Sequence, residues 1–184
     1  MTSGYIERTM IFIDGSNLFR CFKRYHPDVR YSVSKLVEAL SENKRLIRPY
    51  YFGSERVPPI EGQIGFQNQL RYAGIDVTIR PLKIRTKAMD CPYEKTRKCE
   101  STTEIEKGVD VALVTKMISF GLKDTYDTAI LVSGDADYVE AIQQIRDLGK
   151  RVEIAAFPEA TSPSLRKVAD KFINLHDLVE RIKV

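Results

Sequence analysis

Short apolar runs alternate with helically spaced apolar residues along most of the chain. The runs 9–14 and 129–132 contain β-branched residues without polar alternation, which is typical of strands buried on both faces. Further strands are predicted over 46–52, 77–82, 151–157 and 173–175. Helices are predicted from Ser16 or Asn17, either of which could cap the first one, and over 34–43, 60–73, 139–148, 164–172 and 177–182. A capping box between Thr103 and Glu106 predicts one more helix after it.

This alternation predicts an α/β fold, a three-layer α/β/α sandwich with a mostly parallel central sheet. The 184 residues, of which 43% are hydrophobic, suit one domain over 1–184 with a buried core. The sequence has no run of 18 apolar residues and no signal-peptide pattern, so we expect a cytoplasmic protein with no membrane partner. Three cysteines, an odd number, fit a reducing compartment better than a disulfide framework.

One segment, about 83–103, has no hydrophobic period and is rich in charge, so a long basic loop is predicted there. The chain has 29 basic and 25 acidic residues, and this net charge of +4 matters only if the two signs are segregated. Binding of substrate phosphates is expected from the cations of the segment, which are Lys83, Arg85, Lys87, Lys95, Arg97 and Lys98. A solvated surface is the alternative explanation for these charges.

Four aspartates are expected near one edge of the sheet. Asp14 ends the first strand, Asp135 and Asp137 follow the strand at 129–132, and Asp110 lies near a helix start. The carboxyl ends of parallel strands share one edge, and ligands of open α/β sheets bind beyond it. Crowded carboxylates oppose one another's ionisation unless a cation is present, and all-oxygen ligands favour Mg²⁺ or Mn²⁺. Such a site is suited to the hydrolysis of phosphodiester bonds.

Local roles could also explain most of these acids. Asp137 and Glu140 could form a capping box, and an acid such as Asp110 is favoured near a helix N-terminus without any further role. Caps leave Asp135 unexplained. From spacing alone, a metal site and separate local roles both remain open.

Three ordered motifs resemble the NYN-domain proteins of the PIN-like nuclease superfamily. They are Phe-Ile-Asp-Gly-Ser-Asn at 12–17, Glu-Lys-Gly-Val-Asp-Val-Ala-Leu at 106–113 and Leu-Val-Ser-Gly-Asp-Ala-Asp-Tyr at 131–138. The similarity, which is to the bacterial branch of the family, extends over about 9–178. It implies a PIN-like fold that hydrolyses RNA, with Mg²⁺ or Mn²⁺ held by Asp14, Asp110, Asp135 and Asp137. Substrate binding is assigned to polar residues in or beside the motifs, which are Ser16, Asn17, Lys107 and Ser133.

Lys116 departs from the family pattern, in which relatives often carry an acid at that position. It favours a second hypothesis, a catalytically weak or inactive PIN-like module that binds RNA or acts in regulation. A sugar-nucleotide transferase with Asp135 and Asp137 as its metal motif suits the chain less well, because it gives Asp14 and Asp110 no role. Under the first two hypotheses the partner is RNA in single-stranded form. A homodimer, a protein partner and the roles of Cys91 and Cys99 stay open.

Overall fold

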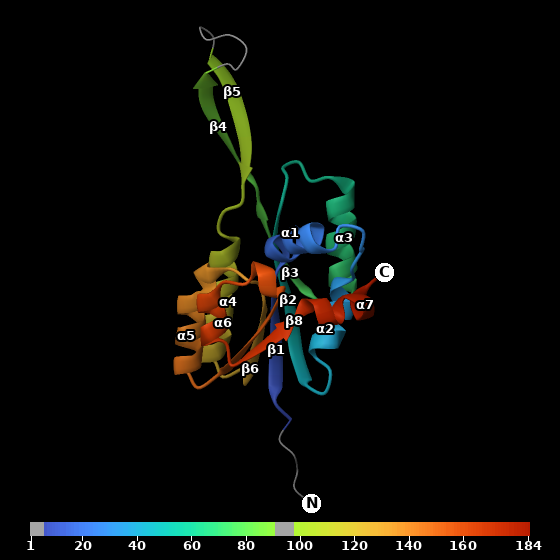
Figure 1. The fold of residues 1–184 in the computed structure, drawn as a ribbon, viewed down its shortest axis with the longest axis vertical. Helices are drawn as coiled ribbons and strands as arrows, with labels where there is room; N and C mark the ends of the chain where they lie inside the picture. Colours follow the sequence, from blue (N-terminus) through green and yellow to red (C-terminus); the bar gives the residue numbers. More distant parts are fainter. Residues whose placement is uncertain (1–5, 91–97) are drawn as a thin grey trace, which may run out of the picture.

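A six-stranded sheet, in which every pair of neighbours is parallel, forms the centre of the molecule (Figure 1). The computed structural model describes residues 6–90 and 98–184. The strand order is β3-β2-β1-β6-β7-β8. These strands are β1 (Arg8–Asp14), β2 (Arg45–Glu55), β3 (Asp76–Pro81), β6 (Thr128–Val132), β7 (Arg151–Ala156) and β8 (Lys171–Asn174).

Helices cover both faces of this sheet, so the fold is the predicted PIN-like three-layer α/β/α sandwich. One face packs against α4 (Val109–Leu122), α5 (Val139–Asp147) and α6 (Pro163–Val168), and the other against α1 (Gly15–Tyr25), α2 (Val33–Leu40), α3 (Glu61–Tyr72) and α7 (Val179–Ile182). Short 3₁₀ turns are η1 (Ala136–Tyr138), η2 (Pro158–Ala160) and η3 (Leu175–Leu178). No helix in the described ranges is long and apolar enough to span a membrane.

The strands contribute side chains to two hydrophobic cores, because successive side chains of a strand point to opposite faces of the sheet. In β1, Met10 and Phe12 pack with the α4 side, while Ile11 and Ile13 pack with the α1 side. All four side chains are 3% exposed or less. Burial on both faces explains why β1 is a continuous apolar run in the sequence.

The sheet changes direction between β1 and β6. From β1 the chain adds β2 and β3 on one side, and it later adds β6, β7 and β8 on the other. In open α/β sheets such a reversal opens a crevice at the carboxyl ends of the two central strands. Asp14 ends β1 and Ser133 directly follows β6, so the first and third motifs meet at this crevice.

The segment predicted as a long basic loop is instead an antiparallel hairpin, and this expectation is wrong where the structure describes it. β4 (Lys83–Asp90) pairs with β5 (Lys98–Ile105), from Lys83 opposite Ile105 to Asp90 opposite Lys98. In Figure 1 the hairpin projects away from the sandwich, on the side where the central strands end. We refer to β4 and β5 as the basic arm.

Two predicted helix boundaries are also wrong. Thr103 lies in β5 rather than at a helix start, and α4 begins only at Val109, after Gly108 in the left-handed region at φ 80°. The helix expected over 164–172 ends at Val168, because Asp170 is tied to β7. Its backbone N–H donates to the Val152 carbonyl, and its carboxylate accepts from the Val152 N–H.

Candidate functional site

Asp14 is the buried acid of the site. It ends β1, and its side chain is the N-cap of α1, since Oδ1 accepts a hydrogen bond of 2.9 Å from the backbone N–H of Asn17. The residue is 3% exposed. The expectation that Ser16 or Asn17 caps this helix is therefore wrong: the carboxylate that ends the strand also starts the helix.

A tyrosine hydroxyl connects Asp14 to Asp110. Tyr138 Oη lies 3.1 Å from Asp14 Oδ2 and 3.0 Å from Asp110 Oδ1, and Ser133 also donates to Asp14 Oδ2 at 3.1 Å. Tyr138 is itself buried, with 1% exposure, whereas Asp110 is exposed in the first turn of α4. We call Asp14, Asp110 and Tyr138 the carboxylate site.

Burial raises the pKa of Asp14 above its ordinary 3.8, and the negative charge of Asp110 raises it further. Hydrogen bonds from Asn17, Ser133 and Tyr138 act in the opposite direction without cancelling the rise. Burial, with both carboxylates adding to it, also raises the pKa of Tyr138 far above its usual range, so the hydroxyl keeps its proton. The site therefore holds negative charge at a free-energy cost that a bound cation would remove.

Asp135 and Asp137 lie at the same edge, with different exposure. Asp135 is half-buried, and its Oδ1 accepts from the backbone N–H of Asp137 at 3.1 Å, which caps η1. The backbone N–H of Asp135 donates to Ser133 Oγ, the same hydroxyl that donates to Asp14. The cap expected of Asp137 is therefore made by Asp135, and the carboxylate of Asp137 is exposed.

The structure brings Asp14 and Asp110 together through one hydroxyl, and it links Asp135 to them through Ser133. Across 6–90 and 98–184, no three acidic, His or Cys side chains are arranged to hold a metal ion. None of the four aspartates forms an ion pair with a basic side chain in those ranges. Two carboxylates with uncompensated charge fit a hard cation, since Mg²⁺ binds through one or two carboxylates and completes its shell with water.

Two of the predicted polar residues, Ser16 and Asn17, make hydrogen bonds that join segments around the site. Asn17 accepts from the Gly134 backbone N–H through its side-chain oxygen at 3.3 Å, which joins the turn after β1 to the turn after β6. Ser16 donates to the carboxylate of Glu106, and Ser54 at the end of β2 donates to the same oxygen. Glu106 thus joins three segments that end at this edge.

A groove of about 790 Å³ begins beside the site and follows α4. Its basic lining residues are Arg80, Lys83, Lys107, Lys116 and Lys123. Lys116 is not directed at the aspartates of the site: its Nζ lies 3.7 Å from Asp76 Oδ1 and 4.5 Å from the centroid of the Tyr50 ring. We call this depression the basic groove.

The basic arm continues from the groove. Lys83 and Arg85 are exposed on β4, and Lys87 and Lys98 belong to the strands of the arm. Lys95 and Arg97 lie outside the described residues, as does Cys91, and Cys99 belongs to β5. Among the described residues, no side-chain hydrogen bond or ion pair joins the arm to Asp14, Asp110 or Tyr138.

Sequence reasoning gave no site role to Tyr138 or Glu106. Tyr138 directly follows Asp137 in the third motif, and its one sequence signal is a polar aromatic residue at the start of a buried helix face. For Glu106 the sequence predicts a local capping box. Its actual partners, Ser16 and Ser54, are 90 and 52 residues away, so no local pattern indicates them.

Comparisons with known proteins show what the chain is similar to. The family model described as the NYN domain matches residues 8–176. The low amplitude and bright protein LabA of Synechococcus elongatus is 25% identical over 175 residues, which cover 94% of this chain and 86% of that protein. A protein of unknown function from Vibrio parahaemolyticus, VPA0982, has a similar crystal structure, with a TM-score of 0.74, 21% identity and full coverage of both chains. The match spans all three motifs, and the chain belongs to the NYN domain family.

Proposed function

We propose that the protein is a metal-dependent ribonuclease that hydrolyses RNA phosphodiester bonds at the carboxylate site. The observation that carries the proposal is the placement of Asp14 and Asp110 on one hydroxyl, with no ion pair to either from the described residues. Membership of the NYN family, within the PIN-like nuclease superfamily, supports the same class of chemistry.

Asp14 and Asp110 would hold Mg²⁺ or Mn²⁺, with Asp135 and Asp137 as further acids at the same edge. When bound, such an ion lowers the pKa of water and neutralises charge that develops on a phosphate. The chain's own contribution is rigid placement. Asn17, Ser133 and Tyr138 fix both oxygens of Asp14, so this acid needs no reorganisation when a ligand arrives.

The charge around the site supports RNA as the substrate. A polyanion needs cations along its path and an acidic metal site only at the bond to be cleaved. The basic groove begins at Lys107, beside the start of α4, and includes Lys83 at the base of the arm. The groove and the arm therefore offer a continuous track for the backbone of single-stranded RNA.

The decisive variant is Asp110→Asn, because Asp110 is exposed and the amide keeps its shape. Second-shell substitutions at metal sites cost about 10- to 100-fold, so loss of a direct ligand charge should lower Mn²⁺-dependent cleavage by about 100-fold or more. Cleavage of a fluorescently labelled single-stranded RNA is measured with Mn²⁺, with Mg²⁺ and with chelator. Asp135→Asn should also lower cleavage, because it removes the charge of another acid at the same edge. The variant should still fold, since the amide oxygen can still cap η1.

Asp147→Asn is the matched control, because Asp147 is exposed at the C-terminal end of α5, the far end from η1, and should leave cleavage unchanged. Equal cleavage by wild type and Asp110→Asn would overturn the proposal. RNA binding without cleavage by the wild-type protein, with either metal, would instead identify a binding module.

The substrate path has its own test in the double variant Lys83→Ala/Arg85→Ala. Both side chains are exposed, so folding should be unaffected. Each lost phosphate contact reduces the slope of log affinity against log salt by about 0.7 for a single strand. RNA affinity is measured in chelator at several salt concentrations, and Lys23→Ala/Arg24→Ala on the exposed surface of α1 is the control. An unchanged slope would remove the arm from the substrate path.

A further inference from the structure

A second cavity, of about 710 Å³, lies on the opposite face of the sheet, between α1, α3 and the end of β2. Phe19 of α1 and Phe66 of α3 line it, and both are exposed, by 60% and 37%. Tyr31 and Tyr51 complete an aromatic wall, with Tyr51 edge-on to Phe66 at 5.6 Å between ring centroids. We call this cavity the aromatic pocket.

One polar atom in this pocket lacks a partner. Gln63 lines the cavity from the first turn of α3, and its Oε1 is buried without a hydrogen bond to any described residue. The neighbouring Gln67, by contrast, donates to Glu55 and accepts from Arg71. A buried acceptor without a donor is unfavourable, so the site calls for a ligand that carries an N–H group.

The pocket lies beside the backbone that follows Asp14. Gly15 and Ser16 line it, and they directly follow Asp14. A Cβ at Gly15 would lie 2.1 Å from Tyr51 Oη, so only glycine lets the tyrosine ring pack on this backbone. Burial raises the pKa of Tyr51, and the charges of Asp14 and Glu106 contribute, which reflects the same proximity.

An unpaired cation stands at the pocket as well. Arg30 lines it, is exposed, and forms no ion pair with the described residues. The pocket therefore combines flat aromatic surfaces, a buried acceptor and a free positive charge. A nucleotide carries the matching groups: a stacking face, N–H groups on the base edge, and a phosphate.

We propose that the aromatic pocket binds one nucleobase of the RNA whose backbone lies at the carboxylate site. The base stacks on Phe19 or Phe66, donates an N–H to Gln63 Oε1, and its phosphate faces Arg30. This inference rests on the proposed function for the identity of the polymer. It adds that the protein grips a base on the α1 side of the sheet, opposite to the basic groove on the α4 side.

The test uses the four nucleoside 5′-monophosphates as probes, with ribose 5-phosphate as the matched ligand without a base. Binding to the full chain is titrated in chelator by NMR. We expect at least one nucleotide to bind about 10-fold or more tighter than ribose 5-phosphate. Phe19→Ala should weaken that nucleotide by roughly 5- to 100-fold, which is the effect of removing a stacking ring.

Gln63→Leu provides a second, independent variant. It removes the orphaned acceptor, so the melting temperature should hold or rise while nucleotide binding falls; a purely structural glutamine would lose stability instead. Tyr72→Ala is the control, because Tyr72 is 90% exposed on the same helix and does not line the pocket. It should bind nucleotides as the wild type does.

Two results would overturn the inference: nucleotides that bind no better than ribose 5-phosphate, or wild-type affinity in both Phe19→Ala and Gln63→Leu. Mn²⁺-dependent RNA cleavage, measured in parallel, separates this outcome from failure of the proposed function. Cleavage without base binding would refute the proposed role of the aromatic pocket and leave the proposed nuclease function standing. Base binding without cleavage would support the proposed role of the aromatic pocket and refute the proposed nuclease function.

Discussion

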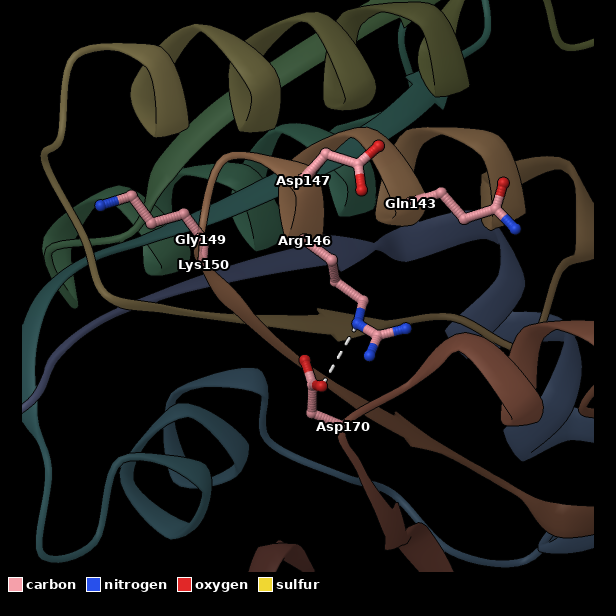
Figure 2. Close-up of a pocket in the computed structure, with 6 residues that line it drawn as sticks. All are labelled: Gln143, Arg146, Asp147, Gly149, Lys150 and Asp170. Carbon is pink, nitrogen blue, oxygen red and sulfur yellow. Dashed lines mark ion pairs between the residues drawn. The ribbon is translucent and has the colours of Figure 1, made fainter.

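Aspartates at the amino edge of the central sheet are paired with cations, and the four aspartates of the candidate site at the carboxyl edge are not paired in the described part of the chain. At the amino edge, Arg8 pairs with Asp127 at 2.7 Å and with Asp124 at 3.3 Å, and Lys150 also pairs with Asp124. Figure 2 shows the pocket at this edge, where Arg146 reaches Asp170 at 3.2 Å. At the carboxyl edge, Asp14, Asp110, Asp135 and Asp137 have no such partners among the described residues.

The contrast separates acids that hold the fold from acids that can hold a ligand. A carboxylate paired with its own protein's cation is already neutralised, and its pairing contributes to the folded state. A buried carboxylate beside another one and without a cation costs stability. Its presence at the switch point of the sheet is then explained by what it binds.

The largest effect is expected where a paired acid loses its cation. Lys44, directly before β2, pairs with Glu153 at 2.5 Å, and their side chains are only 17% and 4% exposed. Lys44→Ala leaves Glu153 buried and unpaired, so the free energy of unfolding should fall by about 3 kcal/mol. Urea denaturation measures this change, and RNA cleavage by the folded variant should be unaffected.

Arg181→Ala is the control for this prediction, because its pair with Glu42 is half-exposed and should contribute about 1 kcal/mol or less. If Lys44→Ala were no more destabilising than Arg181→Ala, the buried ion pair would contribute no more to the free energy of unfolding than an exposed one. The comparison between paired and unpaired acids would then fail.

A smaller effect of opposite sign is expected at the carboxyl edge. The pKa of Asp14 is raised in the folded protein, so its protonated form favours folding at low pH, and this contribution is lost as the pH rises above the ordinary 3.8. In chelator, Asp14→Asn should therefore raise the melting temperature at pH 7. The gain should shrink as the pH approaches 4, where the wild-type acid becomes protonated.

Thermal melts of both proteins from pH 4 to pH 8 test this, with Asp147→Asn as an exposed acid that should show no such trend. The amide keeps an oxygen that can accept from the Asn17 N–H, so the cap of α1 is retained. A variant less stable than the wild type at pH 7 would mean that the carboxylate stabilises the metal-free fold.

The strands and most helices of the sandwich could be predicted because a buried element needs a recognisable pattern of apolar residues. β1 and β6 are buried on both faces, and their apolar runs have no other explanation. The parallel order then places Asp14 and Asp135 at one edge. This much of the candidate site follows from patterns of a few residues.

The sequence of the basic arm has no such apolar pattern. Ile84 is 69% exposed, and Thr103 on the partner strand is also exposed, so neither strand needs an apolar face there. The pairing is made by backbone hydrogen bonds, which any sequence can form. A charged segment without a hydrophobic period therefore predicts a loop, although the structure shows an antiparallel pair.

Contacts between distant segments account for the other errors. Glu106 fits a local capping box with Thr103, but it accepts from Ser16 and Ser54 instead. Local patterns give Tyr138 no role in the site, because its partners, Asp14 and Asp110, come from other elements. Side chains that join two or more segments of a site are the part that local patterns cannot predict.

Tyr138 has one hydroxyl proton and two carboxylate neighbours, at 3.1 Å and 3.0 Å. At any instant it can donate to only one of them, and the other carboxylate then faces a lone pair on the same oxygen. Asp14 and Asp110 are thus inequivalent at every moment, although their distances from the Tyr138 hydroxyl are almost equal. A cation that binds between them therefore meets one carboxylate whose charge is partly offset by the hydrogen bond and one whose charge is not. The two acids attract the cation unequally before any substrate binds.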